Sequence, residues 1–176
     1  AIVYVTDLSG TTNAATANVL KAGHYSFDGT RWNNMLVPKL TGFSAKKIDT
    51  YNITSAGTFD VVYAVVEYDT NSWYNPAEGK FTPKVPGYYQ FTAGLRMQDG
   101  GTTERRISLY KNTDLQFAGT SMIGAQAIVN VVNGMVYLNG TTDFVVVKLV
   151  ATGAINVTSN SAALNQSYFQ GYLVGQ

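Results

Sequence analysis

Apolar and polar residues alternate over short stretches through most of this chain, and turn-forming residues separate the stretches. Because successive side chains of a strand point to opposite faces, such alternation predicts β-strands. After the first forty residues we expect ten strands, at 43–48, 59–67, 79–82, 88–97, 104–111, 115–119, 126–132, 135–139, 144–151 and 167–174. Turn signals separate several of them, at Asp99-Gly100-Gly101, Asn133-Gly134, Asn139-Gly140 and Thr152-Gly153. Many short strands without any helical periodicity favour an all-β antiparallel sandwich.

Residues 1–40 follow a different pattern. The stretch 11–20 is rich in Ala, Asn and Thr and is compatible with either a short helix or a loop. Further along, Asp28-Gly29 lies between aromatic residues, which predicts a β-hairpin with a tight type I′ turn. Its small apolar surface would consist of Tyr25, Phe27 and Trp32. Since a hairpin this small rarely stands alone, we expect residues 1–40 to pack on neighbours as a neck.

Seven residues in the first half of the main domain occur at informative intervals: Tyr63, Asp69, Tyr74, Phe81, Gly87, Tyr89 and Phe91. This spacing resembles the signature of the C1q-type head domain, the jelly roll of complement and tumour-necrosis-factor proteins. Two positions depart from the family pattern. Tyr63 stands where the family usually has Phe, and Ala93 stands where it has Phe or Tyr. The missing ring at Ala93 implies that the core packs differently there.

Further matches lie on both sides, at Phe43-Ser44-Ala45, Leu109-Tyr110-Lys111-Asn112, Leu138 with Gly140, Asp143 and Val145, and Ser167 to Val174. Two extra residues between Gly140 and Asp143 imply a longer turn than the family has. The resemblance covers residues 41–176 and implies a ten-strand jelly-roll head that assembles as a homotrimer. The neck in turn resembles segments of surface and fibre proteins from flavobacteria and their phages.

Three expected strands are apolar on both faces, at 59–66, 127–132 and 144–150. A sandwich strand with one solvated face should alternate, and only one of its faces can meet the opposite sheet. A partner chain is therefore the natural cover for the second face. In the homotrimer that the resemblance implies, we expect the interface to include Val62, Val66, Ile128, Val132, Val146 and Val150.

The composition narrows the partners. A formal net charge of +1 gives no field that would gather nucleic acid or an anionic membrane. The sequence has no cysteine, which excludes a disulfide framework, and no apolar run long enough to span a bilayer. Few charges and abundant Thr, Asn, Ser, Gly and Tyr are typical of extracellular β-rich surface proteins. Because the sequence begins at Ala1 without methionine, we expect a processed or excised piece of a longer protein.

The sequence offers little catalytic chemistry. A hydrolase needs a base poised near neutrality beside a nucleophile or metal, and His24 is the one histidine, with no evident partner. Glu67 and Asp69 would share a strand face and could serve a cation or acid-base chemistry. However, Asp69 begins a turn, where short polar side chains bond their own backbone, and this favours a turn role. We therefore expect no enzyme activity.

Asp99 and Glu104 flank a glycine pair and could supply a calcium loop, and some C1q-type domains do bind calcium. Their spacing matches no calcium-loop motif, which favours a plain hairpin turn, and we expect no other cofactor. Arg105 and Arg106, with Arg96 nearby, form the one basic concentration. These arginines would either discourage aggregation as a solvated strand edge or bind a sulphated or acidic glycan.

Trp73 precedes the signature residue Tyr74 and should point the opposite way. It is either an exposed platform for a sugar or protein, or a cap on the hydrophobic edge. The leading hypothesis is a non-enzymatic trimeric head at the tip of a bacterial surface fibre, phage tail fibre or related injection particle, which recognises a surface glycan or protein. It would lie outside the cell or on a particle surface, joined to an upstream stalk.

The alternative function is purely structural, since a jelly roll of this kind could trimerise, register and cap a fibre without any ligand. A third hypothesis, an enzyme acting on surface polysaccharide, would depend on Asp69, Asp99 or Asp143. It is the weakest of the three because no nucleophile and base can be paired from the sequence.

Overall fold

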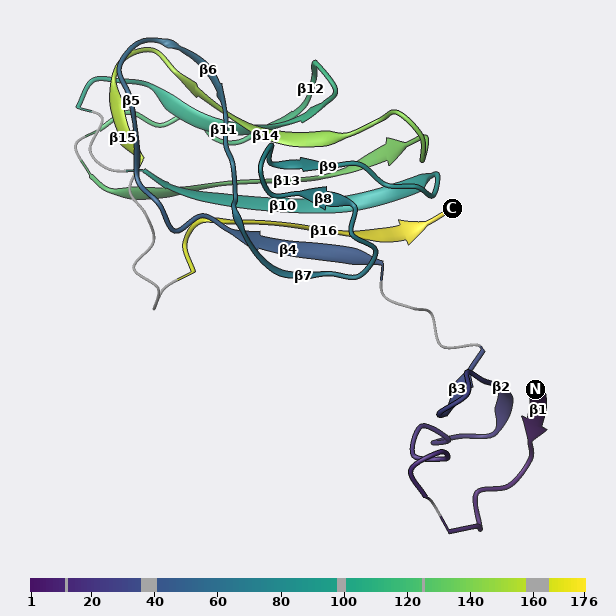
Figure 1. Cartoon of the computed structure of the whole chain (residues 1–176). Coiled ribbons are helices and arrows are strands. Elements are labelled where there is room, and N and C mark those ends of the chain that lie inside the picture. Colours follow the sequence, from purple (N-terminus) through teal and green to yellow (C-terminus); the bar gives the residue numbers. More distant parts are fainter. Residues whose placement is uncertain (12, 36–40, 98–100, 125, 158–164) are drawn as a thin grey trace. The chain divides into compact units, whose positions relative to one another are not determined.

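The structure is a computed structural model that describes the chain except for residues 12, 36–40, 98–100, 125 and 158–164. It forms two compact units, Ala1–Lys39 and Leu40–Gln176. The described residues form strands, turns and loops only (Figure 1). No helix in this described part is long and apolar enough to cross a membrane.

The first unit contains a small antiparallel sheet of three strands in the order β1-β2-β3. These strands are β1 (Ile2–Val5), β2 (Gly23–Phe27) and β3 (Trp32–Asn34). Between β1 and β2, residues 13–19 form successive turns, in which the Asn13 side-chain oxygen accepts hydrogen bonds from the amides of Ala15 and Thr16. The sequence of residues 11–20 was compatible with a short helix or a loop, and the described residues of this stretch form a loop.

The expected hairpin is present, but its turn differs from the predicted one. Phe27 pairs with Trp32, so four residues connect the strands instead of two. The Asp28 carboxylate accepts hydrogen bonds from the amides of Thr30 and Arg31 at 2.8 and 2.9 Å. Gly29 has a positive φ of 105°, whereas a type I′ turn needs two consecutive positive φ values. The prediction of a type I′ turn was wrong because the Asp28 side chain closes a wider loop.

The second unit is a sandwich of two antiparallel sheets (Figure 1). The first has five strands in the order β13-β10-β16-β4-β7. In that order their bounds are Ile128–Leu138, Gly87–Met97, Tyr168–Gly175, Gly42–Lys46 and Val65–Asp69. The long strand β10 lies between β13 and β16 and pairs with β13 over its whole length.

The second sheet of the sandwich has six strands, with the order β12-β11-β14-β9-β8 and β6 paired to β14. The bounds are Asp114–Ala118 for β12, Arg105–Lys111 for β11, Val145–Ala151 for β14, Lys80–Phe81 for β9, Tyr74–Asn75 for β8 and Gly57–Asp60 for β6. A further pair joins β5 (Tyr51–Ile53) to β15 (Ile155–Val157). This architecture confirms the all-β jelly-roll sandwich, and the short strands β5, β8 and β15 are additions to the expected ten.

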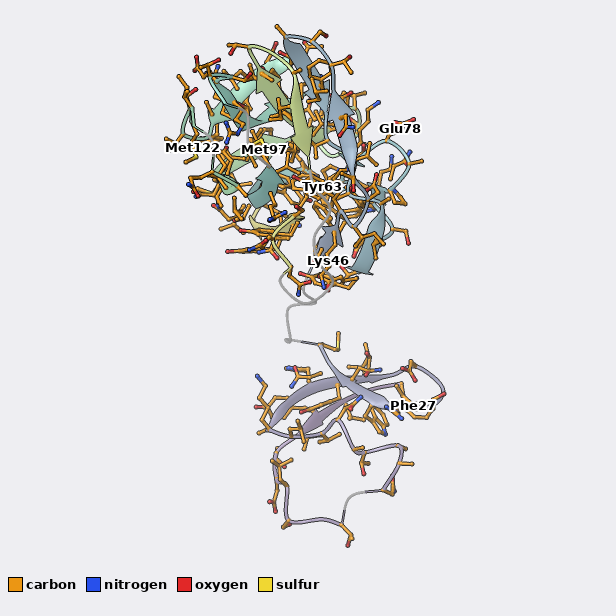
Figure 2. All side chains as sticks on the ribbon, turned by 90° about the vertical axis from the view of Figure 1, so that its left-hand side faces the viewer. Phe27, Lys46, Tyr63, Glu78, Met97 and Met122 are labelled. Atoms are coloured by element: carbon orange, nitrogen blue, oxygen red, sulfur yellow. The ribbon has the colours of Figure 1, made fainter. Side chains whose placement is uncertain are left out.

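Aromatic rings from both sheets meet in the core. Phe43 of the five-stranded sheet stacks on Phe81 and Tyr74 of the other sheet, with ring centroids 4.6 and 4.7 Å apart. Phe169 packs edge-on against Phe43 at 4.9 Å. Tyr63 also points into the space between the sheets, which side chains fill (Figure 2). Such stacked and edge-on pairs add to the stabilisation from burial, so these rings join the two layers.

The two departures from the family signature have local explanations. The Tyr63 hydroxyl donates a hydrogen bond to the Gly94 carbonyl at 3.1 Å, so the extra oxygen is satisfied inside the core. Tyr74 in turn donates to the Tyr63 carbonyl at 2.9 Å. Ala93 pairs across the sheet with Phe169, and both are fully buried. A small residue opposite a large ring keeps the core at normal packing density.

The single strand expected at 59–67 is two strands in different sheets. β6 pairs with β14, whereas β7 pairs with β4. Between them the chain passes from one layer to the other, and the side chains of Val61 and Tyr63 are buried in the core on the way. The prediction failed because a segment that crosses the core has apolar residues on every side. A strand with both faces covered has the same sequence pattern.

Asn133-Gly134 is not the expected turn, since both residues lie within the continuous strand β13. Asn133 pairs with Thr92 and Gly134 with Phe91 of β10. A Cβ atom at Gly134 would lie 2.3 Å from the Phe117 ring. Glycine is therefore needed here because the β12 side chain approaches the backbone closely, and not because the chain turns.

We expect the substitution Gly134→Ala to destabilise the protein by about 1 to 2 kcal/mol, because the new methyl group displaces the Phe117 ring. Urea unfolding of the single variants and of the double variant Gly134→Ala/Phe117→Ala measures the coupling. In the Phe117→Ala background the cost should largely disappear. An equal cost in both backgrounds would contradict this explanation.

Candidate interaction face

The face of the five-stranded sheet that points away from the core carries many of the exposed apolar side chains of the second unit. Alternate residues of its strands point outward, and cross-strand pairs place them in rows. We call this surface the outer face. Its exposed apolar side chains are Val65, Tyr68, Tyr88, Val129, Val131, Met135, Tyr137, Tyr172 and Val174.

Most of the bulky side chains of the outer face gather at one end. Gln90 pairs with Met135 on one side and with Tyr172 on the other, which places these three in one row. In the next row Tyr88 pairs with Tyr137, and their rings meet edge-on at 5.3 Å. Tyr172 is 47% exposed although it lies on the central strand β16. Exposed apolar clusters on a soluble domain usually mark an interaction surface.

The other end of the outer face is polar and slightly hollow. Ser44, Lys46, Glu67, Asn165, Tyr168 and Gln170 line a depression of about 240 Å³. Lys46 forms an ion pair with Glu67, and the Ser44 hydroxyl donates to the same carboxylate at 2.9 Å. The hydrogen bond from Lys46, followed by the one from Ser44, lowers the pKa of Glu67 below its usual value. This carboxylate is therefore engaged within its own sheet.

The six residues predicted for a trimer interface fall in different places. Val66 is exposed on β7 of the five-stranded sheet, whereas Val62 is half-buried where the chain crosses between the layers. Val132 is only 3% exposed and belongs to the core. Ile128 is partly buried and packs against the core. On β13 the outward side chains are instead those at the alternate positions, including Val131 and Met135.

Val146 and Val150 lie on β14 of the six-stranded sheet, away from the outer face. Val146 is buried and Val150 half-buried within a single chain, so their own chain already covers much of this surface. On β13 the double-sided apolarity thus left open which side chains point outward, and the trimer interface itself stays a prediction. A pattern without clean alternation leaves it undetermined which face points to the core.

The three arginines do not form one basic patch. Arg96 lies half-buried on β10, next to Val129 of β13. Arg105 and Arg106 are neighbours on β11 and therefore point to opposite sides. Arg105 is 1% exposed, whereas the Arg106 side chain reaches solvent and lies 3.7 Å from Glu104. Arg106 alone of this adjacent pair is accessible to a ligand.

Arg105 instead fixes loops at one end of the sandwich. Its guanidinium donates to the carbonyl of Gly124 at 3.1 Å, of Gln126 at 3.0 Å and of Thr103 at 3.3 Å. Its backbone amide donates to the Met122 carbonyl at 2.9 Å. The buried side chain of Asn130 donates to the Thr120 carbonyl at 2.7 Å. The carbonyls of Thr120, Met122, Gly124 and Gln126 are thus all bound, which holds the described backbone of this loop in place.

Asp99, half of the predicted calcium pair, lies outside the described residues. Glu104 forms a hydrogen bond with the Ser121 hydroxyl and faces Arg106. Among the described residues, no group of three or more acidic or histidine side chains is arranged to hold a metal ion. Calcium binding at Asp99 and Glu104 therefore stays a prediction.

Asp69 is the last residue of β7, and Trp73 directly precedes β8. Trp73 is half-buried, packs against the core and contacts the Phe81 ring edge-on at 6.3 Å. This position fits a cap on the hydrophobic edge better than an exposed platform. The Asp69 carboxylate accepts hydrogen bonds from the amides of Tyr74 at 2.7 Å and Asn71 at 3.3 Å. Asp69 therefore has the expected turn role.

Among the described Asp and Glu residues, Asp143 is the one that is buried, with 8% of its surface exposed. It accepts hydrogen bonds from Lys111 at 2.8 Å, Asn112 at 3.1 Å and the Asn139 amide at 3.0 Å. Burial by itself raises the pKa of Asp143, but the hydrogen bonds, led by the one from Lys111, outweigh burial and hold the pKa below its usual value. These contacts tie the long turn after Leu138 to the end of β11.

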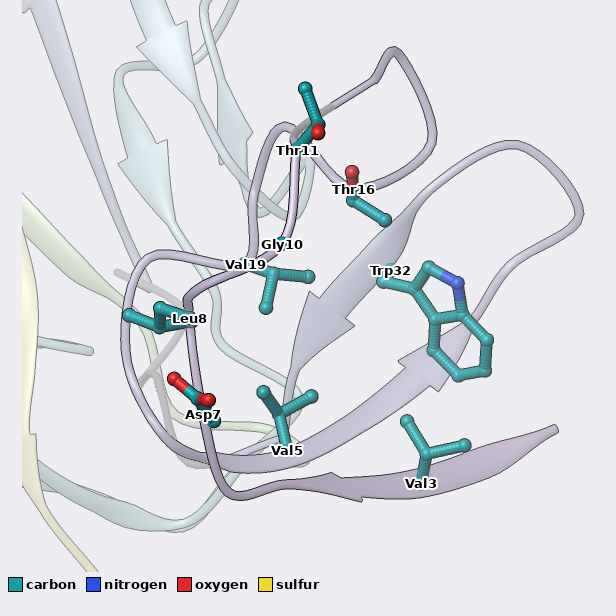
Figure 3. Close-up of a pocket in the computed structure, with 9 residues that line it drawn as sticks. All are labelled: Val3, Val5, Asp7, Leu8, Gly10, Thr11, Thr16, Val19 and Trp32. Carbon is teal, nitrogen blue, oxygen red and sulfur yellow. The ribbon is translucent and has the colours of Figure 1, made fainter.

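The first unit contains an apolar hollow of about 230 Å³ (Figure 3). Val3 and Val5 of β1 and Trp32 of β3 line it on the sheet side, while Leu8 and Val19 come from the loop between β1 and β2. The rim carries Asp7, whose carboxylate is engaged by the amide and the hydroxyl of Ser9. His24 is exposed on the opposite face of the sheet, where its ring meets Tyr4 at 4.7 Å.

Two packed antiparallel sheets, joined by an aromatic core, make the second unit a jelly-roll module. A family model described as the C1q domain matches residues 42–174, and the chain therefore belongs to the C1q domain family. No curated protein matches the sequence.

Solved structures share the fold at low sequence identity. Murine APRIL at pH 8.0 is 11% identical, with a TM-score of 0.56 over 77% of this chain and 100% of the other. Eiger TNF from S. frugiperda is 9% identical, with a TM-score of 0.55 over 78% of this chain and 94% of the other. The globular domain of zebrafish complement 1qA protein is 20% identical, with a TM-score of 0.48 over 77% of this chain and 98% of the other.

Removing the buried guanidinium in Arg105→Met should destabilise the protein by about 2 to 3 kcal/mol, because it leaves several carbonyls without their charged donor. The neighbouring change Arg106→Met, on the solvent side, should cost less than about 0.5 kcal/mol. Thermal unfolding compares the two variants. Hydrogen exchange of residues 120–124 should speed up in Arg105→Met alone, and equal effects in both variants would contradict the role of Arg105.

Stability should also depend on Asp143 in acid. Because the folded pKa lies below the ordinary value of 3.8, the contribution of Asp143 is complete above that value and is lost as pH falls through the folded pKa. The variant Asp143→Asn should therefore be less stable than the parent at pH 7 and should show a shallower loss of stability below about pH 4. Denaturant unfolding from pH 7 to pH 2 measures both curves. Parallel curves would contradict the assignment.

Proposed function

We propose that this chain is the non-enzymatic head of a homotrimer that binds a target on a surface. The observation that carries the proposal is the outer face, where Tyr88, Met135, Tyr137 and Tyr172 stand exposed on a regular sheet. Burying such a surface against other copies removes apolar area from water, which is the main driving force for association. Membership of the C1q family supports the trimer, because the family is known for trimeric assemblies.

The mixed character of the outer face suits a specific contact. The apolar end supplies the driving force. Ser44, Lys46 and Glu67 at the polar end bond one another within one chain, and the rest of their hydrogen-bonding capacity would need polar partners when buried. Polar groups at an interface fix the register between subunits, since misplaced copies would leave them unpaired. This combination supports a single arrangement of the subunits within the proposed trimer.

Target recognition would use the surfaces that assembly leaves free, such as the end loops held by Arg105. A loop with a fixed backbone loses little conformational entropy on binding. Three weak sites on one trimer then reinforce one another through avidity. The proposed setting is the tip of a fibre on a bacterial cell, phage or related injection particle, outside the cytoplasm, with a glycan or protein as target.

A structural cap without a ligand is the second candidate, and the enclosed side chains of Trp73 and Arg105 favour it, since neither is available to a target. Binding of the purified chain to a glycan array and to cells separates the two candidates, because a cap binds neither.

Assembly itself is tested with Tyr172→Asp, which places a charge on the central strand of the outer face. We expect the unchanged chain to sediment as a trimer at micromolar concentration and the variant as a folded monomer, because burying three unpaired carboxylates is costly. The matched control is Ile123→Asp on an exposed loop, which should remain trimeric. A monomeric unchanged chain, or a trimeric Tyr172→Asp variant, would overturn the proposed interface.

A further inference from the structure

The three-stranded sheet of the first unit has one face that a loop partly covers and one bare face. Cross-strand pairs place Val3, Tyr25 and Phe27 on one side, toward the loop that lines the hollow. Tyr25 is fully buried there, and its hydroxyl donates to the Lys21 carbonyl at 2.8 Å. The alternate residues form the other side, which we call the bare face: Ile2, Tyr4, His24, Ser26 and Asn33.

The bare face is apolar along its edge strand. Ile2 is 67% exposed and Tyr4 is 60% exposed, and the Tyr4 ring contacts only His24 among the aromatic side chains described in this unit. Beyond Tyr25, no other large side chain in the described part of this unit is fully buried. Two large apolar groups therefore remain in water on a sheet that has little core of its own.

A unit of this size needs additional stabilisation. Domains below about 40 residues usually depend on disulfides, metals or oligomerisation. The sequence has no cysteine, and the described residues contain no cluster arranged to hold a metal. Oligomerisation is the remaining source of stabilisation among these three, and the bare face is a regular apolar sheet surface available for it.

The charge of the bare face is compatible with contact between identical copies. Residues next to a three-fold axis lie close to their own equivalents, so a charged residue there would meet like charge. Ile2, Tyr4, Ser26 and Asn33 carry no charge, and His24 is neutral in its unprotonated form. The trimer proposed for the second unit would also hold three copies of this sheet on one particle at high effective concentration.

From these observations we infer that the first units of the three protomers pack on one another through the bare face and are stabilised by this contact. The inference rests on the proposed trimer, which supplies the copies. The occupant of the bare face is therefore the same sheet of the neighbouring protomers. The first unit becomes a second assembly element, ordered by trimerisation of the head.

Hydrogen exchange of the β2 amides in the full chain tests the inference. In the unchanged trimer these amides should be protected, and in the variant Ile2→Thr/Tyr4→Thr they should exchange roughly tenfold faster or more, because the sheet has lost its cover. Threonine keeps the strand propensity of β1, so the variant alters the surface more than the strand. The matched control Leu20→Thr removes an exposed apolar side chain from the covering loop and should leave β2 protected.

A third sample, Tyr172→Asp, separates this inference from the proposed function. If Tyr172→Asp is monomeric and its β2 amides lose protection, the head trimer orders the first unit. If the unchanged chain is trimeric but β2 is equally protected in all samples, the first unit is closed by its own chain, and only the inference fails. If the unchanged chain is monomeric, both proposals fail. Unaltered protection of β14 in every sample shows that the head remains folded.

Discussion

The packing of aromatic rings between the two sheets is the interaction on which this structure depends. Phe43, Phe169 and Phe91 from one sheet meet Phe81 and Tyr74 from the other, and burial of these rings holds the layers together. Because every second residue of a strand is committed to this core, the remaining residues must point outward. The positions that point into the core thus determine which residues form the outer face. The Tyr, Met and Val side chains on that face are available for the proposed assembly.

Much of this core could be predicted from the sequence. Five of the seven spaced residues from Tyr63 to Phe91 are aromatic, and all five are buried. Clean alternation in β10 puts Tyr89 and Phe91 on one face, which is the face toward the core. Asp69 was assigned correctly for a different reason, because a short carboxylate at the start of a polar turn has nearby amides to bind.

The candidate site was harder to predict. On β13 the sequence Ile-Val-Asn-Val-Val has apolar residues on both sides, so the alternation does not say that Val131 points outward and Val132 inward. The segment around Val61 and Tyr63 crosses the core, and composition does not distinguish a crossing segment from a buried strand. The dipeptide Asn133-Gly134 is typical of a turn. Glycine is needed at this position, however, because the Phe117 ring, from a residue distant in sequence, approaches the backbone. Each of these errors concerns a contact between distant segments, which local patterns do not encode.

The way in which the loop after β12 is fixed has a consequence for how its sequence can change. Arg105 and Asn130 hold this loop through the carbonyls of Thr120, Met122, Gly124 and Gln126, with a backbone bond at Met122. Every amino acid carries a carbonyl, so the anchoring does not depend on the identity of the loop side chains. An exposed residue such as Ile123 can therefore be replaced while the shape of the loop persists. In such a scaffold, substitutions can change the surface chemistry of a loop without changing its backbone conformation.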